Sequence, residues 1–366
     1  IIDPITRLEG HGRIEIFLND KGDAERAYLI IPELRGFEKF CVGRLSEDMP
    51  QLTSRICGVC PTAHHMASTK TLDDLYKVKP TETALKIRQL IYNAFMFEDH
   101  ALHVYILGGP DFIMGPDAPK EIRNVVGIIN KAPDTAKKLI YIRKKVRDLI
   151  NYLGGKVIHP VFGLAGGVAK AIDPSEIENI KKTAREAYEF ALFTLKIFKE
   201  LVLNNKEYLK LITSEDYTHR TYYMGLVDDN NRVNFYDGKL RVVDPDGKEF
   251  AKFDVKDYLN HIAEYVEPWT YIKFCYLKKV GWKGFVDGKE SGIYSVAPLA
   301  RLNASEGMAT PQAQKAYEEF INTLGKPVHH TLANHWARVI EMIQAAETMV
   351  ELSNDPKILG KDIRNI

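Results

Sequence analysis

The 366-residue sequence lacks features that mark several large classes of protein. No apolar run approaches the ~18 residues of a membrane-spanning helix, and Ile1–Glu9 carry charges and a proline where a signal peptide would be apolar. Because 50 Lys and Arg face 49 Asp and Glu, the net charge is only +1, and no broad basic field is available to attract nucleic acid. The sequence therefore predicts a protein without a membrane span and without a nucleic-acid partner.

Cysteine is scarce as well, and four residues are too few for a secreted disulfide framework. Cys41 and Cys275 stand alone in apolar surroundings, which predicts unreactive thiols in the core. The other two, Cys57 and Cys60, form a C-x-x-C motif two residues after Arg55. Composition does not explain this pair, so the function is sought there.

The composition that remains, 45% hydrophobic and 27% charged residues, is that of an ordinary folded protein. Apolar residues recur at three- and four-residue steps and predict helices in six stretches, which are 61–78, 81–107, 119–153, 174–204, 312–323 and 331–352. Turn residues between two apolar runs predict a hairpin over Gly12–Leu18 and Ala24–Ile31.

Short alternating runs broken by Asp-Gly turns predict a small β-meander within residues 213–257. No linker is rich enough in Pro, Gly or Ser to separate independent domains. The expected fold is therefore mainly α with minor β (α+β): one domain over residues 1–366, with long buried helices forming a bundle and residues 213–257 as an inserted β-rich segment.

The C-x-x-C pair has several possible uses. Cys60 precedes Pro61, where a helix is expected to begin, so the helix dipole and the nearby Arg55 favour a thiolate. His64 follows one helical turn after Cys60 and could donate to the sulfur or become a ligand. A redox disulfide is disfavoured because the preceding segment is polar and contains proline. A structural zinc site with Cys57, Cys60, His64 and a fourth ligand stays open, as does a loop without function.

A series of ordered motifs carries a specific resemblance. The sequence resembles the large subunit of the [NiFe] hydrogenases, most closely the cytoplasmic group that works with heterodisulfide-reductase or diaphorase modules. The motifs cover most of the chain: Asp3-Pro-Ile-Thr-Arg-Leu-Glu-Gly-His11, Arg35-Gly-Phe-Glu38, Arg55-Ile-Cys-Gly-Val-Cys-Pro-Thr-Ala-His64, Asp99-His-Ala-Leu-His-Val-Tyr105, Gly109-Pro-Asp111, Gly154-Gly-Lys-Val-Ile-His-Pro160 and Gly163-Leu-Ala-Gly-Gly167.

The resemblance implies three metal ligands. Cys57 corresponds to a terminal nickel thiolate, and Cys60 to a thiolate that bridges nickel to an iron carrying two cyanides and one carbon monoxide. Glu38 corresponds to a carboxylate ligand of Mg²⁺. Taken without the motif, Glu38 would be an exposed acid in a charged loop.

It also implies roles for residues around the metals. Glu9 corresponds to the carboxylate that relays protons, His64 to the donor that bonds the bridging sulfur, and Asp111 to an acid above the open metal position. Without the family, Glu9 would be a surface acid and Asp111 a turn residue. His100 and His103 have a spacing that could hold a metal, but we expect them to be interior histidines that organise packing.

The implied activity is reversible oxidation of H2 to protons and electrons in the cytoplasm. The chain has too few cysteines for iron–sulfur clusters, so the electrons are expected to pass to a small iron–sulfur subunit, and from there to heterodisulfide-reductase or flavin/NAD diaphorase subunits.

The sequence departs from the family pattern at its end. It does not contain the D-P-C-x-x-C-x-x-H motif that supplies the family's other two thiolates, so the chain by itself is expected to be inactive. Three explanations are open for the missing motif: it could lie in a tail that stays mobile without metal, it could lie in a separate chain, or the protein could be degenerate and lack it. A relative without nickel, such as the quinone-module subunit of respiratory complex I, is disfavoured because Cys57 and Cys60 are present.

Overall fold

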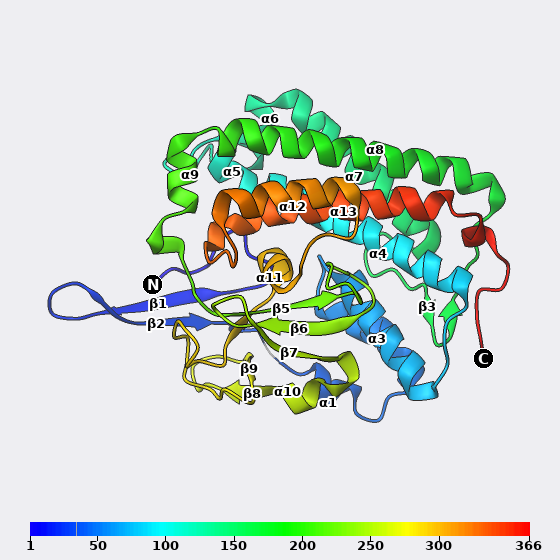
Figure 1. Ribbon diagram of the computed structural model, residues 1–366, viewed down its shortest axis with the longest axis horizontal. Helices are drawn as coiled ribbons and strands as arrows, with labels where there is room; N and C mark the ends of the chain where they lie inside the picture. Colours follow the sequence, from blue (N-terminus) through cyan, green and yellow to red (C-terminus); the bar gives the residue numbers. More distant parts are fainter. Residues whose placement is uncertain (34) are drawn as a thin grey trace.

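The computed structural model describes residues 1–33 and 35–366. Long helices lie side by side along the longest dimension, the strands lie below them in the view of Figure 1, and the two termini are at opposite ends. The helices are α1 (Phe37–Cys41), α2 (Met49–Thr53), α3 (Pro61–Tyr76), α4 (Glu82–Leu102), α5 (Gly109–Ile113), α6 (Val125–Lys131), α7 (Pro133–Gly154), α8 (Ile177–Phe198), α9 (Lys206–Ile212), α10 (Tyr258–His261), α11 (Ala297–Ala304), α12 (Pro311–Leu324) and α13 (Asn334–Asn354). The mainly helical α+β fold is confirmed.

The core is centred on α13, which packs against both α4 and α8. The α4 helix begins where the Thr81 hydroxyl accepts a hydrogen bond from the Ala84 N–H, and its buried residues occupy several faces. A helix that is apolar on several faces must be covered on several sides, so α4 also contacts α3 and α7. Because α4 lies in the middle of the core, its polar residues near the C-terminal end, such as His100, are buried.

Two predicted helices are wrong in their extent. The stretch 119–153 is split, because α6 ends at Lys131 and α7 begins at Pro133, whose ring removes the N–H that a continuous helix would need. The helix from Thr81 was expected to stop at Gly108, but it continues through a π-helical segment, His103–Gly108, into α5. The end of this π-helical segment and the start of α5 both contact Arg7 of the N-terminal loop.

Within residues 1–33 and 35–366, the strands form four small sheets. They are β1 (Arg13–Leu18), β2 (Ala24–Ile30), β3 (Gly163–Leu164), β4 (Gly167–Val168), β5 (Tyr222–Val227), β6 (Lys239–Val243), β7 (Glu249–Asp254), β8 (Ile262–Val266), β9 (Lys273–Leu277) and β10 (Tyr294–Ser295). The β1–β2 hairpin is confirmed, with Arg13 opposite Ile30. Strands β5, β6 and β7 form an antiparallel meander, and β10 joins β5 in parallel. Strands continue beyond residue 257, and α11, which was not predicted, packs on β5.

None of the described helices combines the length and the apolar character that crossing a bilayer requires.

Candidate metal centre

The C-x-x-C motif lies in a short loop between a 3-10 turn, Ser54–Ile56, and the start of α3. Pro61 occupies the first turn of α3, as predicted, since its missing N–H would have no partner there. An added Cβ at Gly58 would meet no atom within 4 Å, so the loop is open at that position. Cys57 and Cys60 are therefore presented on a loop whose far end is anchored by a helix.

Two histidines form hydrogen bonds that fix the segments on either side of this loop. The His65 ring is fully buried, and its Nε2 accepts hydrogen bonds from the backbone N–H groups of Phe162 and Gly163 at 3.2 and 2.9 Å. Its Nδ1 therefore carries the proton and donates to the Pro50 carbonyl at 3.0 Å. His159 Nδ1 bonds the Ser54 carbonyl at 3.0 Å. These hydrogen bonds join α2, α3 and the segment after α7, and so fix both ends of the loop that carries the thiols.

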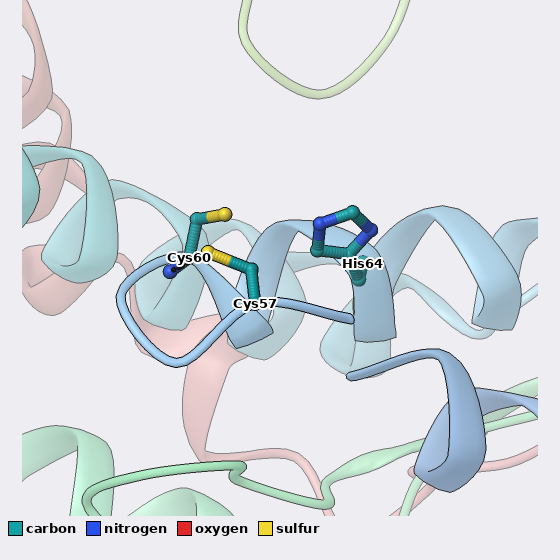
Figure 2. Close-up of side chains that lie close together, drawn as sticks. All are labelled: Cys57, Cys60 and His64. Atoms are coloured by element: carbon teal, nitrogen blue, oxygen red, sulfur yellow. Dashed lines mark hydrogen bonds between the residues drawn. The ribbon is translucent and has the colours of Figure 1, made fainter. Parts of the chain in front are cut away.

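The ligand atoms of Cys57, Cys60 and His64 lie within 4.8 Å of one another. The two sulfur atoms are adjacent, and the imidazole follows one turn along α3 (Figure 2). The Cys60 backbone N–H donates to Cys57 Sγ at 3.1 Å, and the Cys57 thiol donates to Glu9 Oε1 at 3.7 Å. Among the described residues, this is the one group of three metal-ligating side chains with such spacing.

The protonation state of Cys60 differs from the sequence-based expectation. Burial, followed by the hydrogen bond and charge of Cys57 and the charges of Asp99 and Glu9, raises the pKa of the Cys60 thiol to about 12. The helix dipole and Arg55 were expected to favour a thiolate, but the Arg55 guanidinium instead bonds the Gln51 carbonyl and Ser54. The Cys60 thiol therefore loses its proton readily only when a cation binds its sulfur, so the pair of sulfur donors fits a soft metal ion.

His64 is only half-buried, whereas the neighbouring His65 is fully buried. Burial lowers the pKa of His64, which keeps its imidazole neutral at pH 7 and able to donate from one nitrogen. No hydrogen bond joins His64 to either sulfur among the described contacts, so its role as donor to Cys60 stays a prediction.

Sequence reasoning assigned no role to Asp99, although the structure brings its charge close to Cys60. Burial alone would raise the pKa of Asp99, but His100, whose Nδ1 lies 3.5 Å from the carboxylate, and the positive charge of Arg338 lower it. Two signals in the sequence could have found it: Asp99 opens one of the ordered motifs, and with Glu98 it forms an acidic pair near the end of the helix.

The residue after Asp99, His100, belongs to a network of charged and polar side chains with Glu341 and Arg301. His100 Nε2 bonds Glu341 Oε2 at 2.9 Å, and Arg301 bonds both oxygens of Glu341 at 2.6 Å. Glu341 has no solvent exposure. The expectation that His100 is an interior histidine that organises packing is confirmed, because it links α4 to α13.

The other two predicted site residues have different partners. Asp111 pairs with Arg7 at 2.8 Å and lies 3.7 Å from Arg123. Glu38, on α1, is paired with Arg35 at 2.7 Å, and its backbone and Arg35 hydrogen bonds lower its pKa. Neither carboxylate is among the charges that act on Cys60, so their predicted roles are not supported by contact with the thiol pair.

The isolated cysteines are less buried than expected. Cys41 is half-buried and Cys275 is exposed, so the prediction of core thiols is wrong for Cys275. Strand alternation explains the error, because Cys275 lies on β9 between Phe274, which faces inward, and Tyr276.

Comparison with known proteins gives the family. The nickel-dependent hydrogenase family model matches residues 35–122, and a HoxL-like model matches residues 1–34. An F420-non-reducing hydrogenase iron-sulfur subunit of Archaeoglobus profundus is 47% identical over 365 residues, which are 99% of this chain and 75% of that protein. The chain belongs to the nickel-dependent hydrogenases.

Further relatives agree with this assignment. The NAD-reducing hydrogenase HoxS subunit beta of Cupriavidus necator is 35% identical over 98% of this chain and 74% of its own length. The structure of an NAD⁺-reducing [NiFe]-hydrogenase in the H2-reduced state superimposes with a TM-score of 0.91 at 33% identity, over all of this chain and 79% of that one. A [NiFeSe]-hydrogenase from Dm. baculatum shares the fold, with a TM-score of 0.75 at 23% identity. The hydrogenase chain is thus a catalytic large subunit, and a nickel–iron centre is its cofactor.

Removal of either thiol is expected to remove the metal. In Cys57→Ala or Cys60→Ala, the anaerobically purified hydrogenase complex should lose most of its nickel and its H2 oxidation, because one donor of a small thiolate set is gone. Cys275→Ala is the matched control, since this exposed sulfur lies outside the cluster. Elemental analysis measures the result; full nickel content in both single variants would contradict the assignment.

Proposed function

We propose that Cys57 and Cys60 would hold the nickel–iron centre as thiolates, with Cys57 as a ligand of nickel and Cys60 as a ligand of both nickel and iron. The observation that carries the proposal is the convergence of the two sulfurs and His64 within 4.8 Å, next to Glu9. When bound, the centre supplies heterolytic cleavage of H2. The proposal concerns only the ligands that this chain contributes, which are two thiolates and the groups around them.

Glu9 is the proposed proton acceptor. Its Oε1 already accepts a hydrogen bond from Cys57 Sγ at 3.7 Å, so a proton held on this sulfur has a direct route to a carboxylate. The transfer needs no intervening side chain. His64 is proposed to donate its N–H toward Cys60, which would orient the sulfur without adding a charge, because its imidazole is neutral.

Two proposals have support from the family resemblance rather than from contacts. Magnesium at Glu38 is one: among the described residues Glu38 belongs to no group of three metal-ligating side chains, and its carboxylate is paired with Arg35. An acid role for Asp111 above the metal likewise lacks a contact to the thiols, because this carboxylate is paired with Arg7.

We also propose that electrons leave through a small iron–sulfur subunit in a cytoplasmic complex. Two of the four cysteines are used at the centre and the other two are isolated, so this chain offers no cluster ligands of its own. The relatives named F420-non-reducing hydrogenase and NAD-reducing HoxS support a heterodisulfide-reductase or diaphorase module as the next partner.

A structural zinc site is the second candidate, because Cys57, Cys60 and His64 are also zinc ligands. Elemental analysis and infrared spectroscopy of the anaerobically purified complex separate the two. We expect nickel and iron in similar amounts, with infrared bands from iron-bound carbon monoxide and cyanide. Zinc alone, without these bands, would overturn the hydrogenase proposal.

A further inference from the structure

Arg7 connects the N-terminal loop to the start of α5. Its Nη1 donates to the Leu107 carbonyl at 2.8 Å, and its Nη2 donates to Asp111 Oδ1 at 2.9 Å. The second carboxylate oxygen of Asp111 is 2.8 Å from the same Nη2. Arg123 lies 3.7 Å from Oδ1 and adds a second positive charge that holds the Asp111 carboxylate in place. One arginine therefore bridges two elements that are about a hundred residues apart in the chain.

The loop that carries Arg7 has little support from its own backbone. It is closed by the Ile5 N–H to Gly12 carbonyl bond of 2.9 Å, and no described backbone–backbone hydrogen bond involves residues 7–9. Arg7 has φ of 58°, in the left-handed region that a non-glycine residue adopts only when its surroundings hold it there. The side-chain contacts of Arg7 hold the loop before Glu9, and the His11 N–H, which donates to Glu33 Oε1 at 3.2 Å, holds it after Glu9.

Glu9 is two residues from Arg7, at the tip of the same loop. Its carboxylate reaches Cys57 Sγ at 3.7 Å, and this is its one described hydrogen bond. The next residue, Gly10, has φ of 82°, and a Cβ there would lie 2.9 Å from the Glu33 carboxylate, so the chain turns sharply after Glu9. The distance from Glu9 to the thiol thus depends on where the loop is fixed.

We infer that Arg7 and Asp111 form a latch that holds the Glu9 carboxylate against the Cys57 sulfur. Both are then positioning residues, and acting through Arg7 would replace the acid role above the metal that the family resemblance implies for Asp111. The inference rests on the proposed function of Glu9. Because proton transfer requires donor and acceptor within hydrogen-bond reach, a displacement of about 1 Å can lower turnover by as much as ~100-fold.

The experiment uses Asp111→Asn, Arg7→Gln and the double variant in the hydrogenase complex. Deuterium uptake of the peptide spanning residues 5–12 reports the mobility of the loop without reference to the metal. We expect each single variant to speed this uptake by roughly tenfold and to lower H2 oxidation by roughly 10- to 100-fold, with unchanged infrared bands. The double variant should resemble either single variant, because both substitutions release the same latch. Arg7→Lys should recover part of the turnover, since it keeps a charge near Asp111.

Glu215→Gln is the matched control, because Arg220 pairs with both oxygens of Glu215 at 3.0 and 3.1 Å on a different surface. It should change neither readout. Unchanged deuterium uptake in Asp111→Asn, or effects on turnover that multiply in the double variant, would overturn the latch and favour a direct role for Asp111. If Glu9→Gln is fully active, the proposed function of Glu9 fails and the positioning role falls with it, even where uptake shows that the loop has loosened.

Discussion

Glu9→Gln is expected to lower H2 oxidation by the hydrogenase complex by about 100-fold or more, the usual contribution of a general acid or base. The amide keeps the size of the side chain and can still contact Cys57 Sγ, now 3.7 Å from Oε1, but it cannot take up the proton. Nickel content and the infrared bands should be unchanged, because no metal ligand is altered. Turnover with an artificial electron acceptor and elemental analysis of the same preparation measure both effects.

Glu15→Gln provides the control for this substitution. Glu15 lies on β1 and pairs with Arg13 at 3.0 Å, so the same chemical change is made nearby without touching the thiols. Glu9→Asp keeps the carboxylate but shortens its reach, and its turnover should lie between those of the parent and Glu9→Gln. Full activity in Glu9→Gln would show that the proton leaves Cys57 by another route.

Glu341→Gln is expected to lower the free energy of unfolding at pH 7 by about 3 kcal/mol. The substitution leaves the half-buried Arg301 guanidinium without the carboxylate that it contacts at 2.6 Å. Glu341 itself is fully buried, and removing one member of such a pair costs far more than removing an exposed one. Midpoints of urea unfolding for the parent and the variant measure the difference. Glu178→Gln, which affects an exposed pair with Lys181, should leave the midpoint almost unchanged.

Glu341 also makes the stability of the folded protein depend on pH. Burial would raise the pKa of Glu341, but the charge and hydrogen bonds of Arg301, followed by those of His100, lower it from 4.5 to about 2. Since the folded-state pKa lies below the unfolded value, this stabilisation is fully present above about pH 5 and is lost as the pH falls toward 2. The difference between the parent and Glu341→Gln should therefore shrink between pH 5 and pH 3. A constant difference over this range would show that Glu341 is already protonated in the folded protein.

Local features of the site could be predicted because they depend on residues close together in the chain. Pro61 sets the start of α3, and the spacing of Cys57, Cys60 and His64 places their donor atoms within one loop and one helical turn. The β1–β2 hairpin follows from alternation and turn residues in the same way. The helix break at Pro133 was missed because apolar periodicity continues across it, and the continuation of the α4 helix past Gly108 was missed because Gly-Gly-Pro is a typical helix-ending sequence.

The buried charges were not predicted, because their meaning depends on distant partners. Glu341 lies in the long apolar pattern of α13, and nothing near it in the sequence shows that Arg301 and His100 will meet it. Asp111 resembles a turn residue until Arg7 is placed beside it. Each of these pairs forms only when segments from different parts of the chain pack together.

The sequence by itself determined the hydrogenase family, the pair of thiols and the imidazole one turn beyond them, since motif order and short spacing survive in any fold of the chain. Only the tertiary structure decided that Glu9 reaches Cys57, that the charge of Asp99 acts on Cys60, and that Cys60 holds its proton without a metal. The physical reason is that burial and charges from remote segments act through space, and together they outweigh the local helix dipole that the sequence shows.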